Sequence, residues 1–144
     1  MENGLCLPFV SFEKGTFKRG PVSVLAQSGG ISITYLLMLS EAGLGINKVV
    51  SMGNKANLDG VDFLSYLLRD PGTEVIILYL ESIEEGRRLI ELAATSPKPI
   101  IVHKTNIAQA SAEIAFSHTG ALANDDQIVS TALRQAGIAR ALSF

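Results

Sequence analysis

Two side chains in this 144-residue sequence are of types that carry out nucleophilic and acid–base chemistry. His118 stands in the run Ser-His-Thr-Gly-Ala, whose small side chains should leave the imidazole accessible. With an ordinary pKa of about 6.5, an imidazole keeps one ring nitrogen nucleophilic at neutral pH. Glu81 directly follows a mostly apolar run, and a carboxylate bonded to the other ring nitrogen would fix the tautomer. His118 and Glu81 are therefore the predicted catalytic pair; the alternatives are a surface histidine and a solvated loop glutamate.

A third feature is the run Gln27-Ser28-Gly29-Gly30, which joins a predicted strand to a predicted helix. Glycines let a ligand approach the main chain closely. The first N–H groups of a helix lack intrahelical acceptors and carry the positive end of the helix dipole. We expect an anion, phosphate above all, to bind at Ser28, Gly29 and Gly30. The alternative is an ordinary strand–helix turn with Ser28 as its N-cap.

Other polar residues are interpreted as structural. His103 lies within an apolar strand and is predicted to be a core or edge histidine, and Lys104 is predicted to be solvated. Asp125 and Asp126 begin a predicted helix, where they complement the helix dipole more simply than they form a catalytic acid pair. Cys6 is the only cysteine, so no CxxC motif exists, and we predict no metal ligands.

The elements that must position these residues alternate along the chain. Strands are predicted at 22–27, 47–52, 74–80, 99–104 and 138–142. Helices are predicted at 31–42, from 59 or 60 to 69, from a Ser82 N-cap in a capping box with Glu85 to about 96, at 108–116, and from a cap at 124 or 125 to 137. Such alternation is typical of βαβ units around a parallel sheet.

We predict an α/β protein with a flavodoxin-like, three-layer α/β/α fold and about five parallel strands in the order 2-1-3-4-5. Residues 1–21 are expected to form an irregular lead-in, and residues 22–144 the domain. Ligands of open parallel sheets bind beyond the carboxyl ends of the strands. The segments after the predicted strands, with Gln27, Asn54, Glu81 and the run 117–120, should therefore share one edge.

Composition argues against several classes of partner. Twelve basic and fourteen acidic residues give a net charge of -2, so neither nucleic acid nor an anionic membrane surface is expected to bind. No apolar run approaches the roughly 20 residues of a membrane span, and no secretory signal is seen, so a cytoplasmic location is expected. Charged residues are 18% of the chain and hydrophobic residues 47%, which suggests that some apolar surface faces another domain or subunit. The alternative is that a parallel sheet buried on both faces accounts for much of the apolar excess.

Taken together, several segments resemble the second, flavodoxin-like domain of the NDP-forming acyl-CoA synthetases. This family includes succinyl-CoA synthetase α subunits and ADP-forming acetyl-CoA synthetases. The segments that carry the resemblance are 22–30, 50–56, 70–81, 98–102 and Ser-His-Thr-Gly-Ala-Leu-Ala at 117–123.

The resemblance implies roles for individual residues. His118 matches the phosphorylated histidine, Glu81 the carboxylate that holds its ring, and Ser28-Gly29-Gly30 the start of the helix that faces the phosphoryl group. The implied enzyme is an acid–thiol ligase that interconverts acyl-CoA, phosphate and NDP with acid, CoA and NTP, through an acyl phosphate and a phosphohistidine. Further loop contacts are expected from Gln27, Asn54, Thr119 and Gly120.

The resemblance also implies partners that this sequence does not show. They are a Rossmann CoA-binding domain and an ATP-grasp domain or β subunit, in cis or in trans. CoA, NTP or NDP with Mg²⁺, and phosphate are expected of the full enzyme, whereas this domain alone is expected to bind no cofactor. We therefore expect a fragment or subunit that is inactive by itself.

Two other functions are alternatives to this enzyme. The first is a regulatory or binding domain of a multidomain acyltransferase related to these synthetases. The second is a separate flavodoxin-like function. A flavin site is disfavoured because the first strand ends in Gln-Ser-Gly-Gly and tryptophan is absent. A receiver domain is disfavoured because Gln27 and Ser28 stand where it needs an acidic pair.

Overall fold

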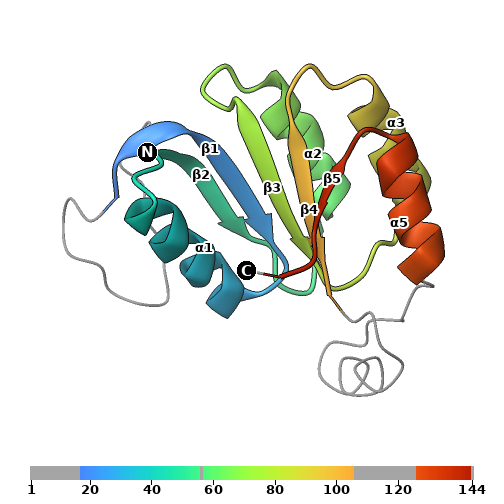
Figure 1. Ribbon diagram of the computed structural model, residues 1–144, viewed down its shortest axis with the longest axis horizontal. Coiled ribbons are helices and arrows are strands. Elements are labelled where there is room, and N and C mark those ends of the chain that lie inside the picture. Colours follow the sequence, from blue (N-terminus) through green and yellow to red (C-terminus); the bar gives the residue numbers. More distant parts are fainter. Residues whose placement is uncertain (1–16, 56, 106–125, 144) are drawn as a thin grey trace.

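The computed structural model describes residues 17–55, 57–105 and 126–143. Strands and helices alternate along them (Figure 1). The elements are β1 (Arg19–Ala26), α1 (Gly29–Glu41), β2 (Ile46–Ser51), α2 (Gly60–Arg69), β3 (Val75–Leu80), α3 (Gly86–Ala94), β4 (Ile100–Lys104), α5 (Asp126–Gln135) and β5 (Ala139–Ala141). None of the helices in the described ranges is long and apolar enough to cross a membrane.

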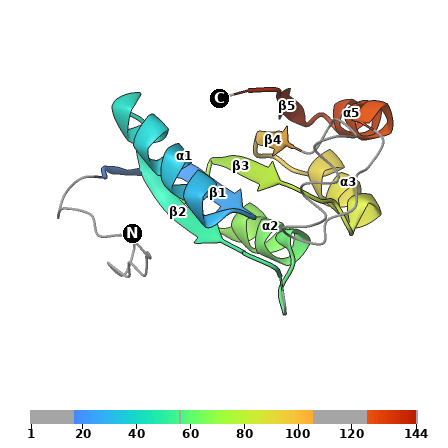
Figure 2. The same ribbon diagram turned by 90° about the horizontal axis from the view of Figure 1, so that it is seen from below.

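The strands form one parallel sheet in the order β2-β1-β3-β4-β5, which confirms the predicted fold. Helices cover both faces, but unequally (Figure 2). The helices α2, α3 and α5 pack on one face, and α1 packs on the other. The connections therefore wind in both directions from β1, and the carboxyl ends of all five strands point to one edge.

The strand β3 is almost continuously apolar because both of its faces are covered by helices. Ile76, Leu78 and Leu80 pack against α2 and α3, whereas Ile77 and Tyr79 pack on the side of α1. All five side chains are buried. A strand covered on both faces needs no polar side, and each large aliphatic side chain buried in this way contributes about 1.5–3 kcal/mol.

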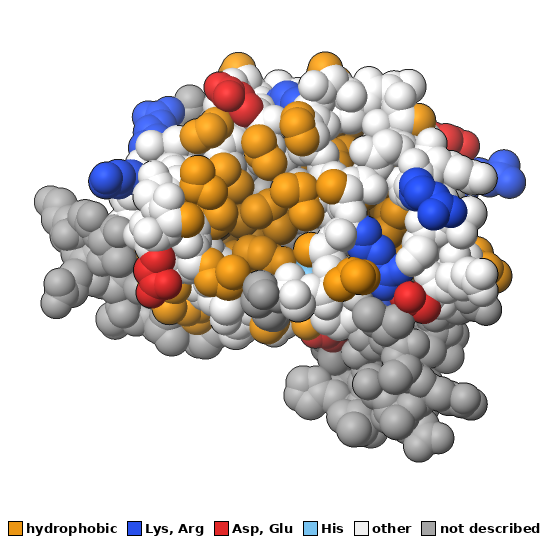
Figure 3. Space-filling model, viewed as in Figure 1, with side chains coloured by type: hydrophobic (Ala, Val, Ile, Leu, Met, Phe, Trp, Pro, Cys, Tyr) orange, Lys and Arg blue, Asp and Glu red, His pale blue; other side chains and the backbone are white. Residues whose placement is uncertain are grey.

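The face that carries α1 leaves apolar side chains at the surface. Figure 3 shows them gathered over α1 and the strands beside it. The helix α1 is apolar on most of its sides; Leu37 and Met38 are exposed on it, and Leu142, after β5, is 72% exposed. This distribution agrees with the excess of apolar residues in the composition.

At the amino ends of the strands, a buried polar cluster joins β1, β2 and the turn before β3. The Oδ2 atom of Asp70 accepts hydrogen bonds from Asn47 Nδ2 at 2.6 Å, Thr73 Oγ1 at 2.6 Å and Lys48 Nζ at 2.7 Å. Ser23 Oγ lies 2.8 Å from Thr73 Oγ1. Burial alone would raise the pKa of Asp70, but the hydrogen bonds from Lys48, Thr73 and Asn47 outweigh it and lower that pKa to about 2.

The first strand begins earlier than predicted, at Arg19 rather than Val22. Its register with β2 is irregular there, since Arg19 and Val22 both align with Ile46. The cause is a close crossing of two glycines: a Cβ atom on Gly20 would lie 2.3 Å from the Cα of Gly45. Only residues without a side chain allow the two backbones to approach so closely.

The predicted capping box of Ser82 and Glu85 is wrong. The helix α3 begins at Gly86, and its N-cap, Glu85, makes no side-chain capping bond. The Ser82 hydroxyl is instead engaged by Gln27 and Lys55, which come from other strand ends, and it donates to Glu84. The predicted helix at 108–116 and the predicted cap at 124 or 125 lie outside the described residues; α5 is described from Asp126.

Candidate functional site

The residue that follows β1 links two of the predicted site segments. The main-chain N–H of Gln27 donates to the carbonyl of Tyr79 at 3.1 Å. Its side-chain Oε1 accepts from the main-chain N–H groups of Glu81 and of Ser82, the latter at 3.0 Å, and its Nε2 donates to Ser82 Oγ at 3.3 Å. One amide side chain thus joins the start of α1 to the loop after β3.

Ser28 has the extended backbone of an N-cap, with φ -106° and ψ 130°, and its Oγ accepts from the N–H of Ile31 at 3.4 Å. The first turn of α1 contains no acidic residue. Among the residues that the structure describes, a Cβ atom added at Gly30 would meet only Ser28 Oγ, at 3.9 Å. Ser28 is therefore an N-cap, and the binding of an anion at Ser28, Gly29 and Gly30 stays a prediction.

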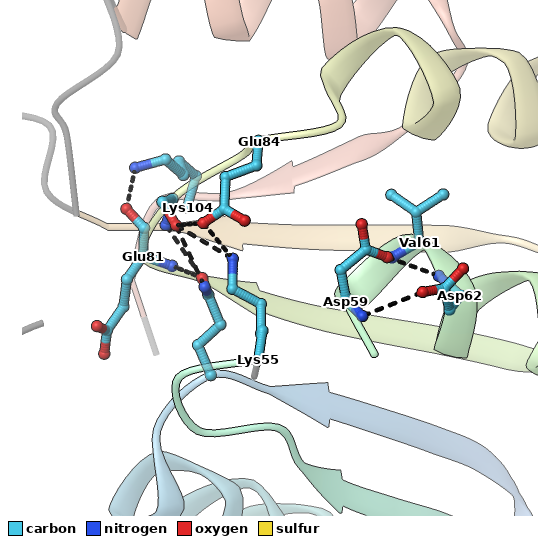
Figure 4. Close-up of polar contacts among 9 residues, drawn as sticks. Lys55, Asp59, Val61, Asp62, Glu81, Glu84 and Lys104 are labelled. Carbon is cyan, nitrogen blue, oxygen red and sulfur yellow. Dashed lines mark hydrogen bonds and ion pairs between the residues drawn. The ribbon is translucent and has the colours of Figure 1, made fainter. Parts of the chain in front are cut away.

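Glu81 is the first residue after β3, and its main chain is bonded on both sides. Its N–H donates to Gln27, and its carbonyl accepts from Lys104 Nζ at 2.8 Å. Figure 4 shows its carboxylate pointing away from the side chains of Lys55 and Glu84. The main chain of Glu81 is thus anchored, and its carboxylate extends beyond the end of the strand.

The prediction of a solvated Lys104 is wrong, because this side chain is only 3% exposed. Its Nζ donates to the carbonyls of Glu81 and Thr105. Burial lowers the pKa of Lys104, while the negative charges of Asp126 and Glu81 oppose that shift. The sequence does hold a signal for this burial: Ile100 and Val102, at alternate positions of the same strand, are buried core residues.

His103 is buried, which confirms its interpretation as a core or edge histidine. Its Nδ1 lies 3.0 Å from the hydroxyl of Tyr35, and its ring contacts the Tyr79 ring edge-on, with centroids 5.3 Å apart. Burial lowers the pKa of His103, so the neutral imidazole is favoured. The described contacts of His103 therefore lie within the core on the α1 side of the sheet.

A second polar group at this edge was not selected from the sequence. Lys55 Nζ donates to Glu84 Oε1 at 2.7 Å and to Ser82 Oγ at 3.3 Å (Figure 4). The hydrogen bond from Lys55 lowers the pKa of Glu84. Asn54, the predicted loop contact, is exposed beside Lys55. Sequence offers little warning of this group, because Lys55 comes from the segment after β2, whereas Ser82 and Glu84 come from the loop after β3.

The start of α2, close to that group, is already occupied by acidic side chains. Asp59 Oδ1 accepts from the N–H groups of Val61 and Asp62, and Asp62 Oδ2 accepts from the N–H of Asp59 (Figure 4). Between this helix end and α3 lies a pocket of about 30 Å³, which has room for little more than water. Two carboxylates make this helix start a poor site for an anion, in contrast to the start of α1.

The remaining predicted site residues, His118, Thr119 and Gly120, lie outside the described residues, as does Asp125. Asp126 stands in the first turn of α5, as expected, and forms an ion pair with Arg140. Within the described ranges, no three or more His, Cys, Asp or Glu side chains are grouped so that they could bind a metal ion. The structure thus brings Gln27, the start of α1 and Glu81 together, and the pairing of Glu81 with His118 stays a prediction.

A five-stranded parallel sheet with polar residues at its carboxyl edge defines a flavodoxin-like α/β domain. The family model described as "Succinyl-CoA ligase like flavodoxin domain" matches residues 19–144, and the chain belongs to this family.

Two relatives are each 39% identical to the chain. The ADP-forming acetate–CoA ligase I of Archaeoglobus fulgidus matches over 92% of this chain and 20% of its own length. The α subunit of the ADP-forming acetate–CoA ligase I of Pyrococcus furiosus matches over 87% of this chain and 28% of its own length. The chain thus spans about a fifth to a little over a quarter of these proteins.

A solved structure of an acetyl-coenzyme A synthetase is also similar to this chain in fold and sequence. The acetyl-coenzyme A synthetase 1 of Candidatus Korarchaeum cryptofilum, in complex with phosphate and ADP, superimposes with a TM-score of 0.79 and 40% sequence identity. The match covers 88% of this chain and 28% of that one. The fold and the family resemblance are thereby confirmed.

Proposed function

We propose that this chain is the phosphohistidine-carrying domain of an NDP-forming acyl-CoA synthetase, an acid–thiol ligase. The overall reaction is acyl-CoA, phosphate and NDP giving acid, CoA and NTP. The relatives support this proposal, since those compared above are named as ADP-forming ligases or as an acetyl-CoA synthetase. The observation that carries it within this chain is the Gln27 link, which ties Glu81 to the glycine-containing start of α1.

In the proposed reaction, phosphate attacks the thioester carbonyl; the C–S bond breaks, and CoA leaves. A ring nitrogen of His118 then attacks the phosphorus of the acyl phosphate. The P–O bond to the acyl oxygen breaks, and the free carboxylate leaves with that electron pair. A terminal phosphate oxygen of NDP next attacks the phosphohistidine, which forms NTP and returns His118 to its starting state.

Two groups would assist His118. The Glu81 carboxylate accepts the N–H of the second ring nitrogen, which fixes the tautomer and stabilises the imidazolium formed during transfer. The main-chain N–H groups at Ser28, Gly29 and Gly30, with the dipole of α1, stabilise the phosphoryl oxygens. Gln27, Asn54, Thr119 and Gly120 are the proposed loop contacts at this edge.

The other substrates would be bound by partners. We propose a Rossmann CoA-binding domain and an ATP-grasp domain or β subunit, in cis or in trans, and a cytoplasmic location. We propose that Mg²⁺ accompanies the nucleotide on the partner, since this ion is usually held by one or two carboxylates together with substrate phosphates.

The test is labelling of the full-length protein, purified with any subunit that accompanies it. With Mg²⁺ and ATP labelled at the γ-phosphate, we expect a phosphoryl adduct that is stable in base and lost in acid, and that cold ADP removes. His118→Asn should abolish it. Equal labelling of His118→Asn and the parent would refute the proposal, and absence of label from both would favour the regulatory alternative.

A further inference from the structure

We propose that Gln27 and Lys104 are positioning residues that clamp the main chain of Glu81 from two sides and thereby fix the place of its carboxylate. The inference rests on the proposed function, because it assigns these residues to the carboxylate expected to orient His118. As positioning residues, both side chains act through the main chain of Glu81.

The first arm of the clamp comes from Gln27, the residue that follows β1. Gln27 Oε1 accepts from two successive main-chain N–H groups, those of Glu81 and Ser82. Its Nε2 donates to Ser82 Oγ at 3.3 Å, so both ends of the amide are used. Gln27 itself is anchored through its main-chain N–H, which donates to Tyr79 at the end of β3. This geometry fixes the amide side of residue 81.

The second arm comes from β4. Lys104 aligns with Leu80 in the sheet, so its side chain emerges beside the peptide that follows β3. Its Nζ donates to the Glu81 carbonyl at 2.8 Å and to the carbonyl of Thr105. A buried ammonium group costs free energy unless it is well bonded, and here main-chain carbonyls are among its partners. The second arm thus fixes the carbonyl side of residue 81.

The clamp matters because no secondary structure holds this segment. The strand β3 ends at Leu80, and α3 begins only at Gly86. Residue 81 therefore stands at the start of a loop, where main-chain rotation would swing the carboxylate. Its N–H is bonded to the side chain that follows β1, and its carbonyl is bonded to a side chain of β4, so the peptide is restrained in the manner of a strand residue. Misplacing a catalytic group by about 1 Å can cost about 10²-fold in rate.

The chain offers a matched control for Lys104. Lys98 Nζ also donates to two main-chain carbonyls, those of Leu67 at 2.9 Å and Asp70 at 2.7 Å. These bonds lie at the amino ends of the strands, at the opposite edge of the sheet. A Lys98→Met variant therefore removes the same kind of interaction without touching Glu81, and it reports what loss of a structural lysine does by itself.

The experiment compares Gln27→Met, Lys104→Met, Lys104→Arg and Lys98→Met in the full-length protein with its accompanying subunits. The first readout is hydrogen exchange of the segment containing Glu81 and Ser82. We expect at least tenfold faster exchange in Gln27→Met and Lys104→Met. We expect parental exchange in Lys98→Met, and at least partial recovery in Lys104→Arg, which keeps a cationic donor.

The second readout is the rate of His118 labelling. Gln27→Met and Lys104→Met should each slow it by about 10- to 100-fold. Because both act through Glu81, neither should slow labelling further in a Glu81→Gln background, whereas Lys98→Met should be without effect in either background. A merely structural role would not produce this dependence on Glu81.

The outcomes separate the clamp from the proposed function. Unchanged exchange at Glu81 in both methionine variants overturns the clamp, even if His118 is labelled normally. Effects that multiply with Glu81→Gln, or that Lys98→Met reproduces, overturn its role in positioning. If the parent takes no label at His118, the proposed function and the catalytic purpose of the clamp fall together, and the exchange data alone decide whether the clamp holds the main chain.

Discussion

The Nζ atom of Lys48 lies 2.7 Å from Oδ2 of Asp70, and this ion pair joins β2 to the residue at which α2 ends. Asn47 and Thr73 bond to the same carboxylate oxygen. The pair therefore stabilises the edge of the sheet opposite the candidate site. Residues that stabilise the fold there are distinct from the residues of the candidate site at the carboxyl ends of the strands.

The pH dependence of stability should reveal this carboxylate. The pKa of Asp70 is about 2 in the folded chain, against about 3.9 when unfolded. Its contribution of about 2 kcal/mol is therefore complete above about pH 4 and is lost as the pH falls through about 2. Asp70→Asn should remove most of this dependence in denaturant unfolding measured from pH 6 to pH 2. Glu74→Gln, on an exposed carboxylate, should keep it; the same acid profile for Asp70→Asn and the parent would contradict the assignment.

His103 should make stability fall at mildly acidic pH. Its folded pKa is lowered by burial, so the unfolded chain binds a proton more readily. The contribution to stability is therefore full above about pH 6.5 and declines as the pH falls below that value. His103→Gln keeps a hydrogen-bonding side chain but does not titrate in this range. Urea unfolding at pH 7.5 and 5.5 should show a smaller difference for this variant; an identical difference would argue against a pH effect of His103.

The crossing of Gly20 and Gly45 should tolerate no side chain. A Cβ atom on Gly45 would lie 2.4 Å from Gly20 Cα and 2.5 Å from the carbonyl oxygen of Arg19. Because both are backbone atoms, the strands must move apart, and we expect Gly45→Ala to cost about 2–3 kcal/mol. Gly86→Ala is the control, since its Cβ would come no closer than 3.5 Å to Ile83. Thermal or denaturant unfolding would refute the prediction if the two variants were equally stable.

Glu81→Gln should slow phosphoryl transfer to His118 by about 10²-fold, because an amide cannot stabilise the imidazolium as a carboxylate does. Glu84→Gln is a matched control on the same loop, since that carboxylate pairs with Lys55 and lies apart from the Glu81 carboxylate in Figure 4. Rapid-quench labelling of the full-length protein gives both rates. Equal slowing by the two variants would indicate a general effect of loop charge.

The sheet could be predicted from sequence because strands buried on both faces consist of short runs of apolar residues. The segment 74–80 is the clearest case, and the structure places β3 at Val75–Leu80. Local sequence patterns predict capping bonds less reliably where a side chain forms hydrogen bonds with residues distant in the sequence. Ser82 has the spacing of a helix cap, yet Gln27 and Lys55 engage its hydroxyl from other strand ends.

The candidate site was predictable only in part, for the same reason. The position of a residue at a strand end places it at the ligand edge, which is enough to select Gln27, Ser28 and Glu81. Which of these residues bond to one another depends on the order of the strands in the sheet. The alternation of Ile100, Val102 and Lys104 indicates that Lys104 is buried, but its bond to the Glu81 carbonyl depends on which strand lies beside β4. Every residue has a main-chain carbonyl, so the residue types of a sequence do not indicate which carbonyl accepts a given hydrogen bond.

The helix α1 has no acidic residue in its first turn and no basic residue in its last. The dipole of this helix is thus not compensated by the helix's own side chains at either end, unlike that of α2, which has Asp62 at its start and Arg69 at its end. An anion bound at the glycines would supply the missing counter-charge and favour the native state by mass action. The melting temperature should consequently rise with phosphate at concentrations too low for the general stabilisation that phosphate and sulfate give to proteins, which would make buffer choice an inexpensive first test of the electric field at this end of the domain.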